Sequence, residues 1–223
     1  MALLLTTRHW GRTDARTNHA AARRHLTQVD PVLRDIIARV GCCTLKPRPH
    51  HFATLCDSII SQQLSATVAA AIYDRFASLY PRRRPSPRAV KTTPLPFLRR
   101  SGLSGQKARY VKALATGFLD GRIRPQRLAR QTNEEIIGAL VSIHGIGRWT
   151  AEMFLIFALN RLDILPVDDL GIRTAVQRWY GLRSLPKPAR LRRLAKPWHP
   201  YESIACWYLW RSLRKDLETN LRP

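Results

Sequence analysis

The chain has 223 residues, 45% of them hydrophobic, which is enough to bury a core in one large or two small domains. No stretch approaches the roughly 18 apolar residues of a membrane span, so no transmembrane helix is expected. The 38 Lys and Arg residues outnumber 15 Asp and Glu residues, and the formal charge of +23 exceeds what solubility requires. Because the basic residues are spread through the periodic segments, nucleic acid is a better candidate partner than a membrane surface.

The opening Met-Ala-Leu-Leu-Leu-Thr-Thr is too short for the core of a signal peptide and lacks a charged leader. We therefore expect an intracellular protein, cytoplasmic and nucleoid-associated if bacterial and nuclear if eukaryotic. Its cysteines, Cys42, Cys43, Cys56 and Cys206, have no zinc-ribbon spacing, and His50 and His51 do not complete a standard ligand set. We interpret the cysteines as free thiols and expect no metal site.

Helical spacing of apolar residues begins only after an N-terminal segment, here called the lead. The stretch up to about Arg24 lacks periodicity and predicts a basic, mobile lead. From Pro31 to Gly41 the spacing predicts a first helix, and two more follow from His51 and through Phe76. A turn, Ser61-Gln62-Gln63-Leu64-Ser65, joins these two helices.

The remaining segments also favour helices. Three prolines within residues 81–87 predict a basic loop without regular structure. Beyond that loop, helices are predicted over residues 95–100, 107–119, 133–142, 148–159, 170–180, 188–195 and 203–217. Few segments alternate with a period of two, so the fold class is all-α, and its length suits two helical lobes with a cleft between them.

One segment reads as helix, tight turn, helix. Thr132 and Glu135 have the spacing of a capping box, which starts the first helix. Gly145 and Gly147 flank Ile146, so the backbone can turn sharply and present amide groups where the next helix begins. Such a turn can bind phosphate, although a Gly-x-Gly is also compatible with a plain connection.

Several motifs in a fixed order give this chain a family resemblance. The run from Ile143 to Ala151 resembles the hairpin of base-excision DNA glycosylases, and Leu165-Pro166-Val167-Asp168-Asp169-Leu170-Gly171 resembles their catalytic-aspartate segment. The similarity extends to residues 58–65, 102–108, 198–201 and 206–211. It implies a helix-hairpin-helix glycosylase domain over residues 25–214, with a hairpin at 133–159, a catalytic segment at 165–180 and a tail at 215–223.

Two absences place the chain within that superfamily. Lyases that resemble endonuclease III have a nucleophilic lysine where this chain has Trp149, and an indole cannot form a Schiff base. The four-cysteine iron-sulfur loop of the endonuclease III and adenine-glycosylase branches is also missing, since only Cys206 lies in the last third. The resemblance is therefore to the 3-methyladenine, or alkylated-base, glycosylases.

The resemblance also assigns a base pocket and a catalytic group. Trp149 and Trp210 correspond to pocket aromatics, which could hold a cationic alkylated base against an indole face, and Met153 replaces a further aromatic. Core packing is the alternative for both tryptophans. Asp169 is implied as the carboxylate that stabilises an oxocarbenium-like sugar, with Asp168 supporting or capping; spacing alone does not distinguish the two.

DNA contacts are implied at two turns. The amides of Gly145, Ile146 and Gly147 would hold the backbone, with help from basic side chains at Arg148, Arg173 and Lys107. The Gln62-Gln63 turn would supply the side chain that fills the gap left by a flipped base, with Gln63 as our choice and a plain helix-joining loop as the alternative.

These expectations define one function and two alternatives. The first is a monofunctional N-glycosylase that excises 3-methyladenine and 7-methylguanine from duplex DNA as a monomer. It needs no cofactor, although the resemblance allows a structural monovalent cation at the hairpin carbonyls. The alternatives are a non-catalytic helix-hairpin-helix DNA-binding module and a glycosylase for uracil, hypoxanthine or an oxidised base.

Overall fold

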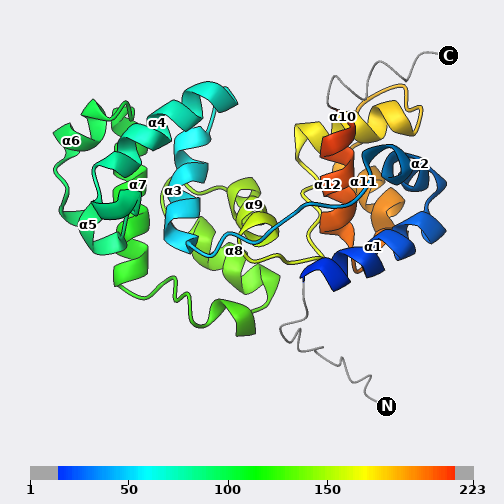
Figure 1. The fold of residues 1–223 in the computed structure, drawn as a ribbon, viewed down its shortest axis with the longest axis horizontal. Helices are drawn as coiled ribbons and strands as arrows, with labels where there is room; N and C mark the ends of the chain where they lie inside the picture. The colour runs from blue at the N-terminus through cyan, green and yellow to red at the C-terminus, as the bar shows by residue number, and fades with distance from the viewer. Residues whose placement is uncertain (1–14, 214–223) are drawn as a thin grey trace. The chain divides into compact units, whose positions relative to one another are not determined.

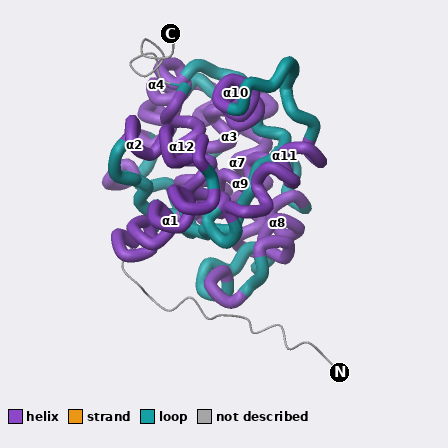
Figure 2. Tube along the Cα trace, turned by 90° about the vertical axis from the view of Figure 1, so that its right-hand side faces the viewer, coloured by secondary structure: helices purple, strands orange, loops and turns teal. Residues whose placement is uncertain are grey.

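The described part of the chain is helical throughout. The computed structural model describes residues 15–213, and within this range it contains twelve α-helices, three short 3-10 helices and no strand (Figure 1, Figure 2). The chain divides into two compact units. Unit 1 comprises Met1–Thr44 and Leu170–Pro223, and unit 2 comprises Leu45–Asp169. The all-α prediction and the prediction of two helical lobes are confirmed.

Unit 2 is built around α3 (His51–Ser61), which packs against α4 (Ala66–Ser78), α7 (Gly105–Leu119) and α9 (Arg148–Phe157). Figure 1 shows α5 and α6 beside α7. Leu55, Ile59 and Ile60 of α3 are completely buried. The other elements are η1 (Pro81–Arg83), α5 (Pro87–Thr92), α6 (Leu95–Arg100), η2 (Leu128–Arg130) and α8 (Asn133–Val141).

Unit 1 combines the two ends of the described chain. Its α12 (Glu202–Ser212) packs against α2 (Pro31–Val40) and α10 (Leu170–Trp179), while α1 (Ala15–Val29) packs against α2 and α12. Leu26, Leu33, Ile36 and Tyr208 are completely buried there. The remaining elements are α11 (Pro188–Ala195) and η3 (Lys196–Trp198).

A buried carboxylate ties the elements of unit 1 together. Asp30 is 6% exposed and is the N-cap of α2, where Oδ1 accepts hydrogen bonds from the amides of Val32 at 2.9 Å and Leu33 at 3.0 Å. Its Oδ2 accepts from the Tyr180 hydroxyl at 2.5 Å and the Trp198 indole Nε1 at 2.8 Å. Burial and the bond to Asp30 raise the pKa of Tyr180, so the phenol stays a donor.

Two parts of the chain differ from the prediction. Helix α1 begins at Ala15 and buries Ala22, so the predicted lead of residues 1–24 is too long; residues 1–14 and the predicted tail of 215–223 lie outside the described residues. Its buried residues include His19 and Ala22 beside Leu26, so large apolar residues do not mark the period. Residues 81–87 contain η1, and Pro87 begins α5 because proline suits the first position of a helix after a capping Ser86.

Across residues 15–213, no helix is both long enough and apolar enough to cross a bilayer.

Candidate active site and nucleic-acid interface

The predicted hairpin consists of α8, a tight turn and α9. Its capping box is confirmed: Thr132 Oγ1 accepts from the Glu135 amide at 3.3 Å, and Glu135 Oε2 accepts from the Thr132 amide at 2.6 Å. Gly145 has a φ of +97°, and Gly147 is the N-cap of α9 without a side-chain cap. No side chain caps the first amides of α9, as is expected of a turn that binds phosphate.

The predicted amide donors of the turn are not equivalent. The Ile146 amide donates to the Ile143 carbonyl at 3.1 Å, and the Ile146 side chain is 4% exposed. Without DNA the turn itself uses this amide, and the predicted contact of Ile146 with phosphate stays a prediction. The Ile146 side chain anchors the turn to the core of unit 2. Gly145 and Gly147 stay predicted contacts.

Gly145 lies against an aromatic ring that the sequence did not single out. A Cβ at Gly145 would come within 2.1 Å of Tyr110 Cγ, whereas a Cβ at Gly147 would meet nothing within 4 Å. The Tyr110 ring also packs edge-on against His144, with centroids 4.9 Å apart. Helix α7 thus supports the hairpin turn, and only glycine fits at position 145.

The two glycines make a matched pair of substitutions. Gly145→Ala is expected to lower the free energy of unfolding by about 2 kcal/mol or more, because the methyl group overlaps Tyr110 and the φ is unfavourable. Gly147→Ala is expected to change it by less than about 1 kcal/mol but to weaken DNA binding, since its Cβ protrudes where phosphate would approach. Urea unfolding and DNA titration of both variants test this; equal destabilisation would contradict it.

Arg148 is engaged by two carboxylates. Its Nε donates to Glu152 Oε1 at 3.1 Å, and its terminal nitrogens donate to the Glu134 carboxylate at 2.5 and 3.1 Å. Burial raises the pKa of Glu152, and the Arg148 hydrogen bond lowers the pKa of Glu134. The guanidinium therefore ties α8 to α9, and its charge is largely balanced within the protein.

The predicted wedge turn is joined to the hairpin. Gln62 Nε2 donates to the Gly145 carbonyl at 3.1 Å and lies 3.5 Å from Thr150 Oγ1, so Gln62 positions the two turns. Gln63 is exposed and has a φ of +58°, a left-handed conformation that residues other than glycine adopt rarely. Gln63 remains the predicted wedge, whereas the Gln62 side chain is already engaged.

Lys107, in α7, also contacts the wedge turn. Its Nζ donates to the carbonyl of Ile60, in the last turn of α3, at 2.6 Å and to that of Gln62, the C-cap of α3, at 2.7 Å. Burial lowers the pKa of Lys107. A lysine at the C-terminal end of a helix balances its dipole, so Lys107 holds the wedge turn in place. Two of its three hydrogen-bond donors are thus used inside the protein.

The two aspartates that spacing could not distinguish have different surroundings. Asp169 is 8% exposed, and its Oδ2 accepts a hydrogen bond from Trp149 Nε1 at 2.7 Å. Asp168 is exposed. The buried carboxylate is held by the hairpin helix itself, because Trp149 is the second residue of α9. This is the geometry expected of a fixed catalytic group.

Trp149 does not pack as a core residue. Its side chain is 45% exposed, while its N–H donates to Asp169. Met153 follows one turn later in α9 and is 8% exposed. Core packing is therefore the wrong interpretation of Trp149, and its role and that of Met153 in a base pocket stay predictions.

The other predicted site residues belong to unit 1. Trp210 lies in α12 and is half-buried. Arg173, in α10, donates from Nε to the Pro186 carbonyl at 3.0 Å and thereby fixes the loop before α11. Their roles as a pocket wall and a phosphate contact stay predictions.

Unit 2 thus contains a glycine hairpin whose second helix holds a buried carboxylate, the features of a helix-hairpin-helix protein built around an acidic site. The chain belongs to the HhH-GPD superfamily of base excision DNA repair proteins, whose family model matches residues 56–200.

Similar proteins cover nearly the whole chain. DNA-3-methyladenine glycosylase 1 of Schizosaccharomyces pombe is 32% identical over 215 residues, which are 93% of each chain. The alkylbase DNA glycosidase-like protein mag2 of the same yeast is 32% identical over 87% of this chain and 94% of its own.

Solved structures agree with this family. A DNA-3-methyladenine glycosidase from Bacillus halodurans superposes with a TM-score of 0.81 at 32% identity and covers 92% of this chain and 94% of its own. The S. pombe 3-methyladenine DNA glycosylase in complex with abasic DNA superposes with a TM-score of 0.78 at 33% identity, covering 88% and 98%.

Proposed function

We propose that this protein is a monofunctional DNA glycosylase that hydrolyses the N-glycosidic bond of alkylated bases of the 3-methyladenine and 7-methylguanine type in duplex DNA. The observation that carries this proposal is the buried Asp169 carboxylate held by Trp149 of the hairpin helix. The names of the relatives support alkylated bases as the substrate class. The structure of the yeast enzyme with abasic DNA supports DNA as the binding partner. We further propose that the protein acts as a monomer.

The reaction requires charge stabilisation at the sugar. An N3- or N7-alkylated purine is cationic and leaves as a neutral base, so little acid assistance is needed. Positive charge then develops on the sugar, where a fixed carboxylate lowers the barrier and orients or deprotonates the attacking water. Asp169 has that role in the proposed mechanism, and the part-exposed indole of Trp149 attracts the cationic base before the bond breaks.

The product of this reaction is an abasic site rather than a broken strand. A lyase reaction starts with an amine that attacks the anomeric carbon and forms a Schiff base. The residue that donates to Asp169 is an indole, whose N–H is a hydrogen-bond donor and not a nucleophile. We therefore propose hydrolysis without strand cleavage.

The bond between Trp149 and Asp169 has its own test. Trp149→Phe keeps an aromatic face but removes the N–H donor, so we expect the single-turnover rate of base excision to fall about tenfold while DNA affinity changes by less than about threefold. Trp179→Phe, in α10, serves as a control for loss of an indole elsewhere. An unchanged rate for Trp149→Phe would show that the bond does not support catalysis.

The function itself is tested with methylated duplex DNA. The wild-type protein is expected to release free 3-methyladenine and 7-methylguanine, with strand breaks appearing only after alkali. Breaks before alkali would contradict the absence of lyase activity. Tight DNA binding without release of these bases would favour the binding module or a different lesion, and duplexes containing uracil, hypoxanthine or 8-oxoguanine would distinguish those two.

A further inference from the structure

The segment from the end of α4 to the end of α7 has an extreme charge composition. Residues 75–119 contain no Asp or Glu, and their eleven basic residues are Arg75, Arg82, Arg83, Arg84, Arg88, Lys91, Arg99, Arg100, Lys107, Arg109 and Lys112. Arg83 pairs with Asp74, just before the segment, but no acidic residue within the segment balances the other charges. The segment therefore presents a strong positive potential.

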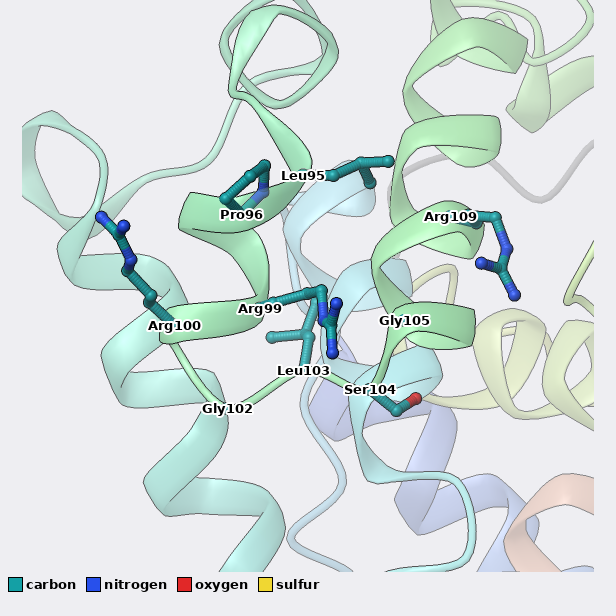
Figure 3. A pocket seen from close by; sticks show the side chains of 9 residues that line it. All are labelled: Leu95, Pro96, Arg99, Arg100, Gly102, Leu103, Ser104, Gly105 and Arg109. Carbon is teal, nitrogen blue, oxygen red and sulfur yellow. The ribbon is translucent and has the colours of Figure 1, made fainter.

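Three arginines of this segment line a cavity. A cavity of about 710 Å³ lies between α6 and the start of α7, and Figure 3 shows its walls. Its basic side chains are Arg99, Arg100 and Arg109, and the other lining residues are Leu95, Pro96, Gly102, Leu103, Ser104 and Gly105. In Figure 3 the Arg99 side chain extends from α6 toward the first turn of α7.

The arginines of the cavity keep their charge available. All three are exposed, and none of the ion pairs formed within residues 15–213 involves them. Arg100 lies over the Phe97 ring at 5.3 Å, an interaction that leaves its donors open. They differ in this respect from Arg148 at the hairpin, which two carboxylates balance.

Helix α7 connects the cavity to both turns of the candidate DNA interface. Gly105 and Arg109 line the cavity, Lys107 holds the wedge turn, and Tyr110 supports Gly145. Because a helix rises 1.5 Å per residue, Gly105 and Tyr110 are only about 8 Å apart along its axis. A duplex carries a phosphate charge for about every 1.7 Å of its axis, so DNA at the hairpin brings many phosphates near the cavity.

We propose that the cavity lined by Arg99 and Arg109 binds backbone phosphate of the same DNA, as a second contact besides the hairpin turn. This inference rests on the proposed function in that the partner is duplex DNA. The hairpin supplies neutral amides, whereas the cavity supplies full charges. The affinity of the protein for undamaged DNA and its dependence on salt then come in large part from this second contact.

The test uses a double variant, Arg99→Gln with Arg109→Gln, in the full chain. The logarithm of its binding constant for undamaged duplex is expected to fall less steeply with the logarithm of salt concentration, by about 0.9 for each phosphate that the variant no longer neutralises. At low salt the affinity should drop at least about fivefold. Arg192→Gln with Arg193→Gln, two exposed residues of α11, removes the same charge elsewhere and should leave the slope unchanged.

The outcomes separate this site from the proposed function. An unchanged slope for the cavity variant, or an equal change in the α11 control, would overturn the phosphate site. If the wild type releases no alkylated base but the slope still falls only for the cavity variant, the site stands and the proposed substrate is wrong.

Discussion

Asp169→Asn is expected to lower the rate of base excision by roughly 100- to 10,000-fold while the affinity for DNA changes by less than about threefold. Asparagine has the same shape and can still accept the hydrogen bond from Trp149 Nε1, so the site should keep its geometry. It carries no negative charge, so it cannot stabilise a cationic sugar or accept a proton from water. Single-turnover release of 7-methylguanine from methylated duplex measures the effect.

Asp168→Asn is the matched control for that experiment. Asp168 is the preceding residue and has the same chemistry, but it is exposed, and water screens its charge. Its variant should excise within about threefold of the wild-type rate. If Asp168→Asn lost the activity and Asp169→Asn kept it, the assignment of the catalytic carboxylate would be reversed. Equal, small effects would remove both from the mechanism.

Asp30→Ala is expected to lower the free energy of unfolding by about 3–5 kcal/mol. The change removes the N-cap of α2, which is worth about 1 kcal/mol, and leaves the donors of Tyr180 and Trp198 without their acceptor at about 1–3 kcal/mol each. Trp198 is completely buried, so water does not replace the lost partner. Thermal unfolding should shift down by roughly 10 °C.

The control lies in the same helix. Asp35 is also an aspartate of α2, but its side chain is 65% exposed and its ion pair with Arg34 is long, at 3.9 Å. Asp35→Ala should change the free energy of unfolding by less than about 0.5 kcal/mol. A comparable loss in both variants would mean that Asp30 acts through helix charge and not through its buried hydrogen bonds.

Local sequence signals predicted most of the helices and the hairpin. The capping box at Thr132, the glycine at position 145 and the helix stop at Gly41 are decided by residues within a few positions of each other, and the structure confirms them. Helix α1 was missed because two of its buried residues are His19 and Ala22, which give little apolar periodicity. Helix α5 was missed because proline was interpreted only as a helix breaker.

Less of the candidate site could be predicted from the sequence, because its properties depend on residues that are distant in the chain. Spacing could not separate Asp168 from Asp169, since burial and the indole donor come from a helix 20 residues earlier. The basic character of Lys107 predicted a DNA contact, but carbonyls from α3 engage its ammonium group. The support that Tyr110 gives to Gly145 has no signal in the sequence, because only packing brings α7 under the turn.

The division of the chain into units has a consequence for its synthesis. Unit 2 is one continuous stretch, from Leu45 to Asp169, whereas unit 1 needs segments from both sides of it. During translation all of unit 2, including Asp169, is therefore synthesised before α10 and α12. Until then α1 and α2 can pack on each other but lack α12, so these helices are made before unit 2 and complete their packing after it.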